Sequence, residues 1–121
     1  MQVTMAIIKT ETKGNCNLKG KSGENGCTQH MPEVWKLHSK DVLGYEAPQT
    51  YTNEVYVTSH IVQRWIDNGK SDYQIGLLYN GGSLKELKGI NKFGVKYNTK
   101  LYAETLLKNI ALVAEANNQH E

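Results

Sequence analysis

Residues 3–14 read VTMAIIKTETKG, and the interpretation of the whole chain starts from them. Val3, Ile7 and Glu11 are spaced four residues apart, so on a helix the carboxylate shares a stripe with two apolar side chains that face the core. Gly14 is a residue type at which helices commonly end. The pattern predicts a first helix over residues 2–13, with Glu11 in its last turn.

The surroundings expected for Glu11 favour the protonated form of its carboxyl. The C-terminal end of a helix carries the negative end of the backbone dipole, which disfavours an ionised carboxylate. Partial burial also raises the pKa of a carboxyl. A carboxylic acid that stays protonated near neutral pH can act as a general acid. Glu11 is therefore the best catalytic candidate in the sequence.

Four segments of the chain share their order and spacing with a known family. They are AIIKTET (6–12), SGENGCTQHMPEVW (22–35), LLYNGG (77–82) and NTKLYA (98–103). Together they resemble the core of the lytic transglycosylases, which has a Glu-Ser pair at a helix end, a Gly-Leu-Met-Gln-x-Met-Pro segment, Ala-Tyr-Asn-Ala-Gly and Glu-Thr-Arg-x-Tyr-Val. The likeness covers residues 4 to 110, nearly the whole chain. The resemblance implies a mainly α, lysozyme-like fold.

The resemblance also implies a set of substrate-binding residues around Glu11. Thr12 stands where the family has serine, and its hydroxyl could help to orient the following loop. Gln29 matches the family glutamine and Met31 the methionine expected to contact a sugar. Tyr79 and Asn80 match the Tyr-Asn pair, and Tyr102 matches the late tyrosine, for which core packing is an equally good reading. Asn98 and Lys100 depart from the family pattern, and so do Cys27 and Thr28.

The implied activity is cleavage of the bond between N-acetylmuramic acid and N-acetylglucosamine in peptidoglycan. Glu11 would act first as acid and then as base, and the product would carry a 1,6-anhydromuramoyl end. No cofactor or metal is implied. Most glycosidases use two carboxylates, but Glu24, Asp41, Glu46 and Asp72 match no family position for a second one. Glu24 is interpreted as a surface charge of a turn-rich loop.

The remaining sequence predicts a single domain, residues 1–121, with five to six short helices. Residues 15–29 are rich in Gly, Asn and Ser and predict a loop or small hairpin after the first helix. Further helices are expected from Pro32 to about Ser39, from a cap at Thr52 or Asn53 to Gly69, from Ser71 to residues 80–82, and from Asn98 or Thr99 onward. The third has the apolar stripe Val55, Ser59, Val62 and Ile66. Ser83 and Glu86 suggest one more short helical turn, and the tail 115–121 is expected to fray.

Composition narrows the possible partners and location. The net charge of +2 is spread along the sequence, which is not the basic block of a nucleic-acid-binding protein. No segment approaches the ~20 apolar residues of a membrane span. Cys16 and Cys27 flank the Gly-rich loop and predict either a disulfide beside Glu11 or two small buried thiols. They lack the four-ligand spacing of a structural zinc site.

The resemblance implies action on peptidoglycan strands in the cell envelope, in the periplasm or outside the cell. No signal peptide is recognisable, so delivery would depend on a leader, a larger parent protein, a bacteriophage particle or a secretion assembly. Two alternatives remain. One is a goose-type lysozyme-like hydrolase, which uses water as nucleophile. The other is a non-catalytic glycan-binding or virion module that keeps the fold.

Overall fold

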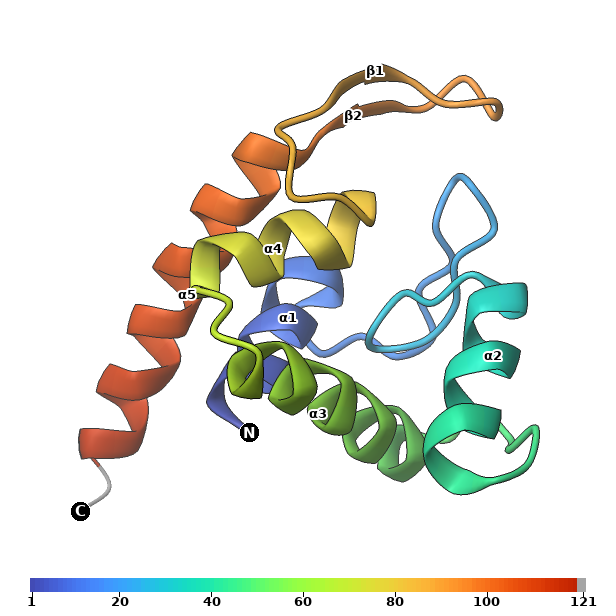
Figure 1. Cartoon of the computed structure of the whole chain (residues 1–121), viewed down its shortest axis with the longest axis horizontal. Coiled ribbons are helices and arrows are strands. Elements are labelled where there is room, and N and C mark those ends of the chain that lie inside the picture. Colours follow the sequence, from blue (N-terminus) through green and yellow to red (C-terminus); the bar gives the residue numbers. More distant parts are fainter. Residues whose placement is uncertain (120–121) are drawn as a thin grey trace.

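A computed structural model describes residues 1–119 of the chain, which form five helices and one two-stranded antiparallel hairpin (Figure 1). The elements are α1 (Gln2–Thr12), α2 (Pro32–Leu43), α3 (Tyr51–Asp67), α4 (Asp72–Gly81), β1 (Lys88–Ile90), β2 (Lys96–Asn98) and α5 (Thr99–Gln119). The expected mainly α fold class is confirmed. The loop of residues 13–31, called the Gly-rich loop below, has isolated bridges at Lys19–Asn25 and Asn25–His30 instead of a regular hairpin.

The core lies where α1 packs against α3, α4 and α5. Val3, Ala6 and Ile7 from α1 meet Val62, Ile75 and Leu106, and this cluster is buried. α4 and α5 approach closely because Gly76 has no side chain: a Cβ there would lie 2.8 Å from the Ala103 Cα atom. The close packing brings the end of α4 and the start of α5 together beside the end of α1.

Residues at the helix ends explain most of the element boundaries. The Thr50 side chain accepts a hydrogen bond from the Asn53 amide and begins α3, two residues before the expected cap. Ser71 and Gln74 form the expected capping box of α4, and Gly82, with a positive φ of 68°, ends that helix. α2 continues beyond Ser39 to Leu43, where Gly44 ends it in the left-handed conformation.

Three expectations need correction. Residues 83–86 form bends and irregular backbone instead of a helical turn, and they lead into the β1–β2 hairpin, which the sequence analysis did not predict. In α3 the buried residues are Glu54, Val57, Thr58 and Val62, so only Val62 of the predicted stripe is buried. Residues 115–119 continue α5 instead of fraying, and the rest of that tail lies outside the described residues.

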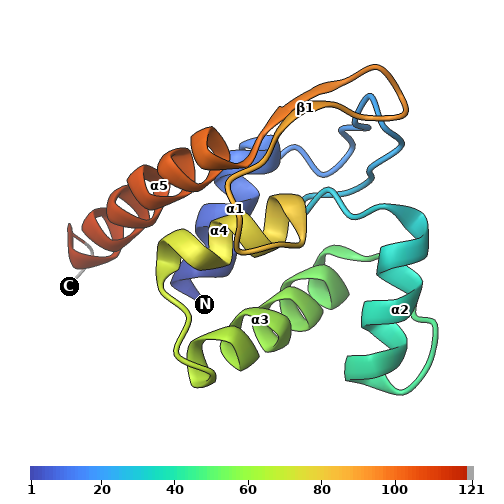
Figure 2. The same cartoon turned by 45° about the horizontal axis from the view of Figure 1, so that its top comes forward.

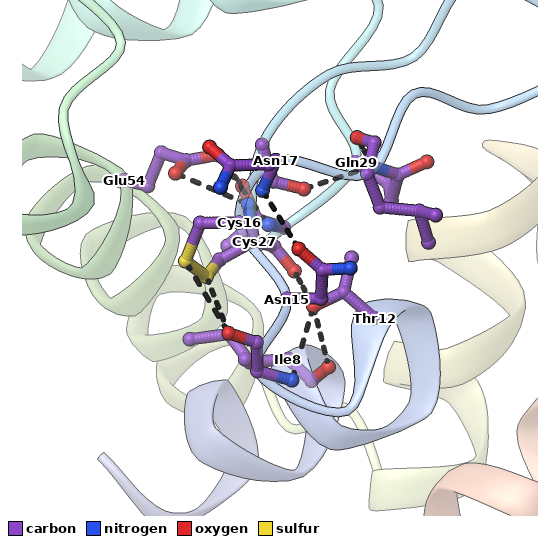
Figure 3. Close-up of a disulfide and its surroundings, with 12 residues drawn as sticks. Ile8, Thr12, Asn15, Cys16, Asn17, Cys27, Gln29 and Glu54 are labelled. Carbon is purple, nitrogen blue, oxygen red and sulfur yellow. Dashed lines mark hydrogen bonds between the residues drawn. A yellow bond between two sulfur atoms is a disulfide. The ribbon is translucent and has the colours of Figure 1, made fainter.

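A disulfide joins Cys16 to Cys27 and closes the Gly-rich loop against the end of α1 (Figure 3). Disulfides persist in oxidising compartments, so this bond is compatible with an extracytoplasmic location. Within residues 1–119, no helix combines the length and the hydropathy needed to cross a membrane.

Candidate active site

A cleft of about 1630 Å³ runs between the Gly-rich loop and the β1–β2 hairpin. Its floor comes from the last turn of α1, the end of α4 and the start of α5, and the beginning of α2 forms one side. Figure 2 shows the hairpin extending from α5 towards the Gly-rich loop. The Asn91 side-chain amide donates a hydrogen bond to the Ser22 hydroxyl at 2.9 Å, so the two walls of the cleft touch.

Glu11 lines this cleft from the last turn of α1, as the sequence pattern predicted. Its Oε2 atom accepts a hydrogen bond from the Tyr102 hydroxyl at 2.8 Å. Burial raises the pKa of the Glu11 carboxyl from 4.5 to about 7, the Tyr102 hydrogen bond opposes this shift, and the charge of Glu24 adds to it. Near neutral pH the Glu11 carboxyl can therefore be present in both its protonated and its ionised form.

Two tyrosines from different helices stand beside Glu11. The rings of Tyr79 on α4 and Tyr102 on α5 are stacked, with centroids 6.5 Å apart and planes inclined by 17°. The Tyr79 hydroxyl donates to the Thr28 carbonyl at 2.5 Å, which ties α4 to the Gly-rich loop. Burial, and next the charge of Glu11, hold the pKa of both phenols well above 10, so both remain hydrogen-bond donors.

Three more predicted site residues line the same cleft: Gln29, Met31 and Asn80. Gln29 has a positive φ of 53°, and its side-chain amide donates to the carbonyls of Leu18 and Gly26. These two bonds use both amide hydrogens, so Gln29 can offer a ligand only its carbonyl oxygen. Through these two bonds Gln29 stabilises the turn of the Gly-rich loop.

Thr12 does not reach the cleft, which corrects its expected role in substrate binding. Its side chain is buried, and its hydroxyl lies 3.2 Å from the Ile8 carbonyl and 3.0 Å from the Cys27 carbonyl (Figure 3). These contacts join the end of α1 to the Gly-rich loop. Thr12 therefore orients the loop, which is the role that its hydroxyl was expected to support.

Glu54 is a buried carboxylate that no sequence pattern marked as functional. Its two oxygens accept hydrogen bonds from the amides of Cys27 and Thr28, from the Thr28 hydroxyl and from the Gln49 side chain, at 2.8–3.3 Å. Gly26 is required beside it, because a Cβ at that position would collide with the Glu54 carboxylate. Glu54 thus fixes, from α3, the backbone that carries Gln29 and the Thr28 carbonyl.

Glu24 was expected to be a surface charge, but its side chain lines the cleft that contains Glu11. Its Oε1 atom is buried and has no hydrogen-bond partner among residues 1–119. The carboxylate lies against Gly20, where a Cβ would meet the Glu24 carboxylate carbon at 2.6 Å. The lining of the cleft therefore includes two carboxyl groups, those of Glu11 and Glu24.

His30 is buried in the Gly-rich loop and packs edge-on against Trp35. Because the Thr28 hydroxyl donates to the Glu54 carboxylate, it must accept at 2.7 Å from His30 Nδ1, which therefore carries the proton. Burial, and next the proximity of His38, lower the pKa of His30 to about 4, so the ring is neutral near pH 7. In the described part of the chain, no group of three or more His, Cys, Asp or Glu side chains is arranged to hold a metal ion.

We compared the chain with protein-family models, with curated proteins and with solved structures, and none of these comparisons found a match.

Proposed function

We propose that this chain is a lytic transglycosylase of lysozyme-like fold that cleaves peptidoglycan with Glu11 as its acid. The observation that carries the proposal is the position of Glu11: a carboxyl with a pKa of about 7 lines a cleft of about 1630 Å³. A group that titrates near the working pH can both donate and accept a proton efficiently. The mainly α fold and the placement of Gln29, Met31, Tyr79, Asn80 and Tyr102 around this acid support the proposal.

The reaction needs only one acid because the substrate supplies the other groups. Protonated Glu11 donates its proton to the oxygen that links N-acetylmuramic acid to N-acetylglucosamine, and the bond from that oxygen to muramoyl C1 breaks. The 2-acetamido group stabilises the positive charge that develops at C1. The muramoyl C6 hydroxyl then bonds to C1, and the Glu11 carboxylate takes its proton. The result is a 1,6-anhydro ring and a regenerated acid.

The hydrogen bond from Tyr102 suits this cycle. In protonated Glu11, Oε2 accepts from Tyr102, so the acidic proton resides on Oε1. After proton transfer the same hydrogen bond stabilises the Glu11 carboxylate, which then accepts the proton of the C6 hydroxyl. Tyr102 thus favours the base form of Glu11, whereas burial favours the acid form.

Glu24 favours a second candidate function, hydrolysis of the same bond. Its carboxylate lines the same cleft as Glu11 and could accept a proton from a water molecule that attacks C1. The product would then have a reducing end, as expected of a goose-type lysozyme-like enzyme. In this candidate function Glu11 keeps its role as the acid and Glu24 becomes the base.

The test is mass spectrometry of muropeptides released from purified peptidoglycan. We compare wild type with Glu11→Gln and Glu24→Gln, and with Glu33→Gln as a matched change of an exposed acid on α2. Anhydro ends from wild type and Glu33→Gln, reduced about 10²- to 10⁴-fold in Glu11→Gln, support transglycosylation. Reducing ends that depend on both Glu11 and Glu24 support the hydrolase instead. If no variant releases muropeptides but all bind the wall, the chain is a non-catalytic wall-binding module of a virion or envelope assembly.

A further inference from the structure

The expectation that charge is spread evenly along the sequence is wrong for one short segment, in which positive charge is concentrated. Residues 85–100 contain five lysines against one glutamate, a net charge of +4, although the whole chain carries only +2. The other residues therefore carry a net charge of −2. These lysines are all exposed: Lys85, Lys88, Lys92, Lys96 and Lys100. The segment includes the β1–β2 hairpin, which forms one wall of the cleft.

The pairing of the strands determines which lysines face the cleft together. Lys88 pairs with Asn98 and Ile90 pairs with Lys96, so these four side chains lie on one face of the hairpin. All four line the cleft that contains Glu11. Gly89 and Tyr97 lie on the other face, with the Tyr97 hydroxyl 3.1 Å from where a Gly89 Cβ would be, and they also contribute to the lining of the cleft. We call Lys88, Ile90, Lys96 and Asn98 the cationic face.

Neither ammonium group of the cationic face is neutralised by the protein. The two ion pairs among residues 1–119 join Lys36 to Glu33 and Arg64 to Asp41, and neither involves the hairpin. Like charges on one face of a strand pair repel each other. A ligand with carboxylates in the cleft would relieve this repulsion and form charge-assisted hydrogen bonds.

We propose that the cationic face binds the free carboxylates of the peptide stems that hang from each N-acetylmuramic acid. This inference rests on the proposed function, because it places the muramoyl residue beside Glu11 and the stem against the hairpin. The mixture of side chains favours a peptide over a phosphate polymer: 64% of the Ile90 surface is exposed between the lysines, and Phe93 and Val95 continue the lining. Apolar side chains can pack against the alkyl groups of a peptide stem, whereas the phosphate groups of a phosphate polymer have no apolar surface to pack against them.

The test uses two forms of one substrate, purified peptidoglycan free of teichoic acid and the same material with its carboxylates amidated. The Lys88→Gln/Lys96→Gln variant removes both ammonium groups of the cationic face. The Lys85→Gln/Lys92→Gln variant changes the net charge equally, but neither residue lines the cleft. Wild type and this control should cleave native peptidoglycan about two- to tenfold faster than the amidated form. The Lys88→Gln/Lys96→Gln variant should lose this preference, whereas an unchanged preference would overturn the inference.

Binding separates failure of this inference from failure of the proposed function. In a Glu11→Gln background, co-sedimentation with the same two substrates measures stem recognition without cleavage. Stronger binding to the native form that disappears with Lys88→Gln/Lys96→Gln supports the inference even if no anhydro ends are ever found. A third substrate, cell wall that retains teichoic acid, is measured in the same way. If Lys88→Gln/Lys96→Gln weakens binding only to this third substrate, the ligand is a phosphate polymer and the inference is wrong.

Discussion

Two residues beside Glu11 shift the pKa of its carboxyl in opposite directions, so substitution of either residue tests that pKa. Tyr102 donates to the carboxylate and lowers the pKa, whereas the charge of Glu24 raises it. A general acid must be protonated, so kcat/KM of the wild type should fall as the pH rises through about 7. Tyr102→Phe should shift this fall to higher pH, and Glu24→Gln should shift it to lower pH.

The pH–rate profile of muropeptide release measures both shifts. Tyr73→Phe is the matched control for Tyr102→Phe, because the Tyr73 hydroxyl bonds to Glu86 away from the cleft. Shifts in the same direction for Tyr102→Phe and Glu24→Gln would contradict the assignment of the titrating group to Glu11.

The raised pKa of Glu11 also implies that this residue destabilises the fold at alkaline pH. Its folded-state pKa of about 7 exceeds the unfolded value of 4.5, so the folded state binds the proton more tightly. The loss in the free energy of unfolding is absent below pH 4.5 and grows between pH 4.5 and 7. Above pH 7 it reaches its full value of about 3 kcal/mol. Glu11→Gln, which can still accept from Tyr102, should therefore be more stable than wild type at pH 8 and similar to it at pH 4.

Thermal unfolding at the two pH values checks this prediction. Glu33→Gln, in an exposed position on α2, removes only a surface ion pair with Lys36 and should change Tm little at either pH. A Glu11→Gln variant with no gain at pH 8 would mean that the carboxyl is well solvated, and the acid role would lose its physical basis.

At the scale of elements, the Gly-rich loop contains little regular structure, so its conformation depends on a disulfide and on hydrogen bonds to Glu54. The disulfide joins Cys16 near its start to Cys27 near its end (Figure 3). Glu54 on α3 accepts three hydrogen bonds from Cys27 and Thr28 of the loop, and a fourth from the Gln49 side chain. Glu54→Gln replaces one acceptor oxygen by an NH₂ group that faces N–H donors. We expect the free energy of unfolding to fall by about 2–3 kcal/mol. Urea denaturation measures it, with exposed Glu46→Gln expected to change it by less than about 0.5 kcal/mol.

The helices could be predicted from sequence where a local signal marks them. Ser71 with Gln74 and Thr99 at the start of α5 lie at or next to the observed boundaries, because capping is a contact between close neighbours in the chain. The β1–β2 hairpin was missed because its strands have three residues each and all six are exposed, so there is no alternation of apolar and polar residues to detect. Glu54 was missed for a related reason: a charged residue holds a buried position of α3, where patterning expects an apolar one.

At the scale of the whole molecule, the cleft joins segments that are far apart in the chain. Glu11 was predictable because its own helix places it on the core stripe. Its contact with Tyr102 spans 91 residues, so only the family resemblance suggested that they belong to one site. Glu24 had no such signal, because its direction depends on the positive φ angles of Gly23 and Gly26 and on the space beside Gly20.

The closed outline of the cleft depends on the hydrogen bond between Asn91 and Ser22, which spans 69 residues. Ser22→Ala removes this acceptor and leaves the bonds within the hairpin turn, Asn91 N to Val95 O and Gly94 N to Asn91 O, intact. The loss of about 1 kcal/mol should increase the exchange rate of these two amide hydrogens about fivefold. Amide hydrogen exchange measured residue by residue tests this, with the amides of α3 as the internal reference. Equal exchange in both proteins would mean that the hairpin holds its position over Glu11 without the Gly-rich loop, and that the two walls of the cleft are independent.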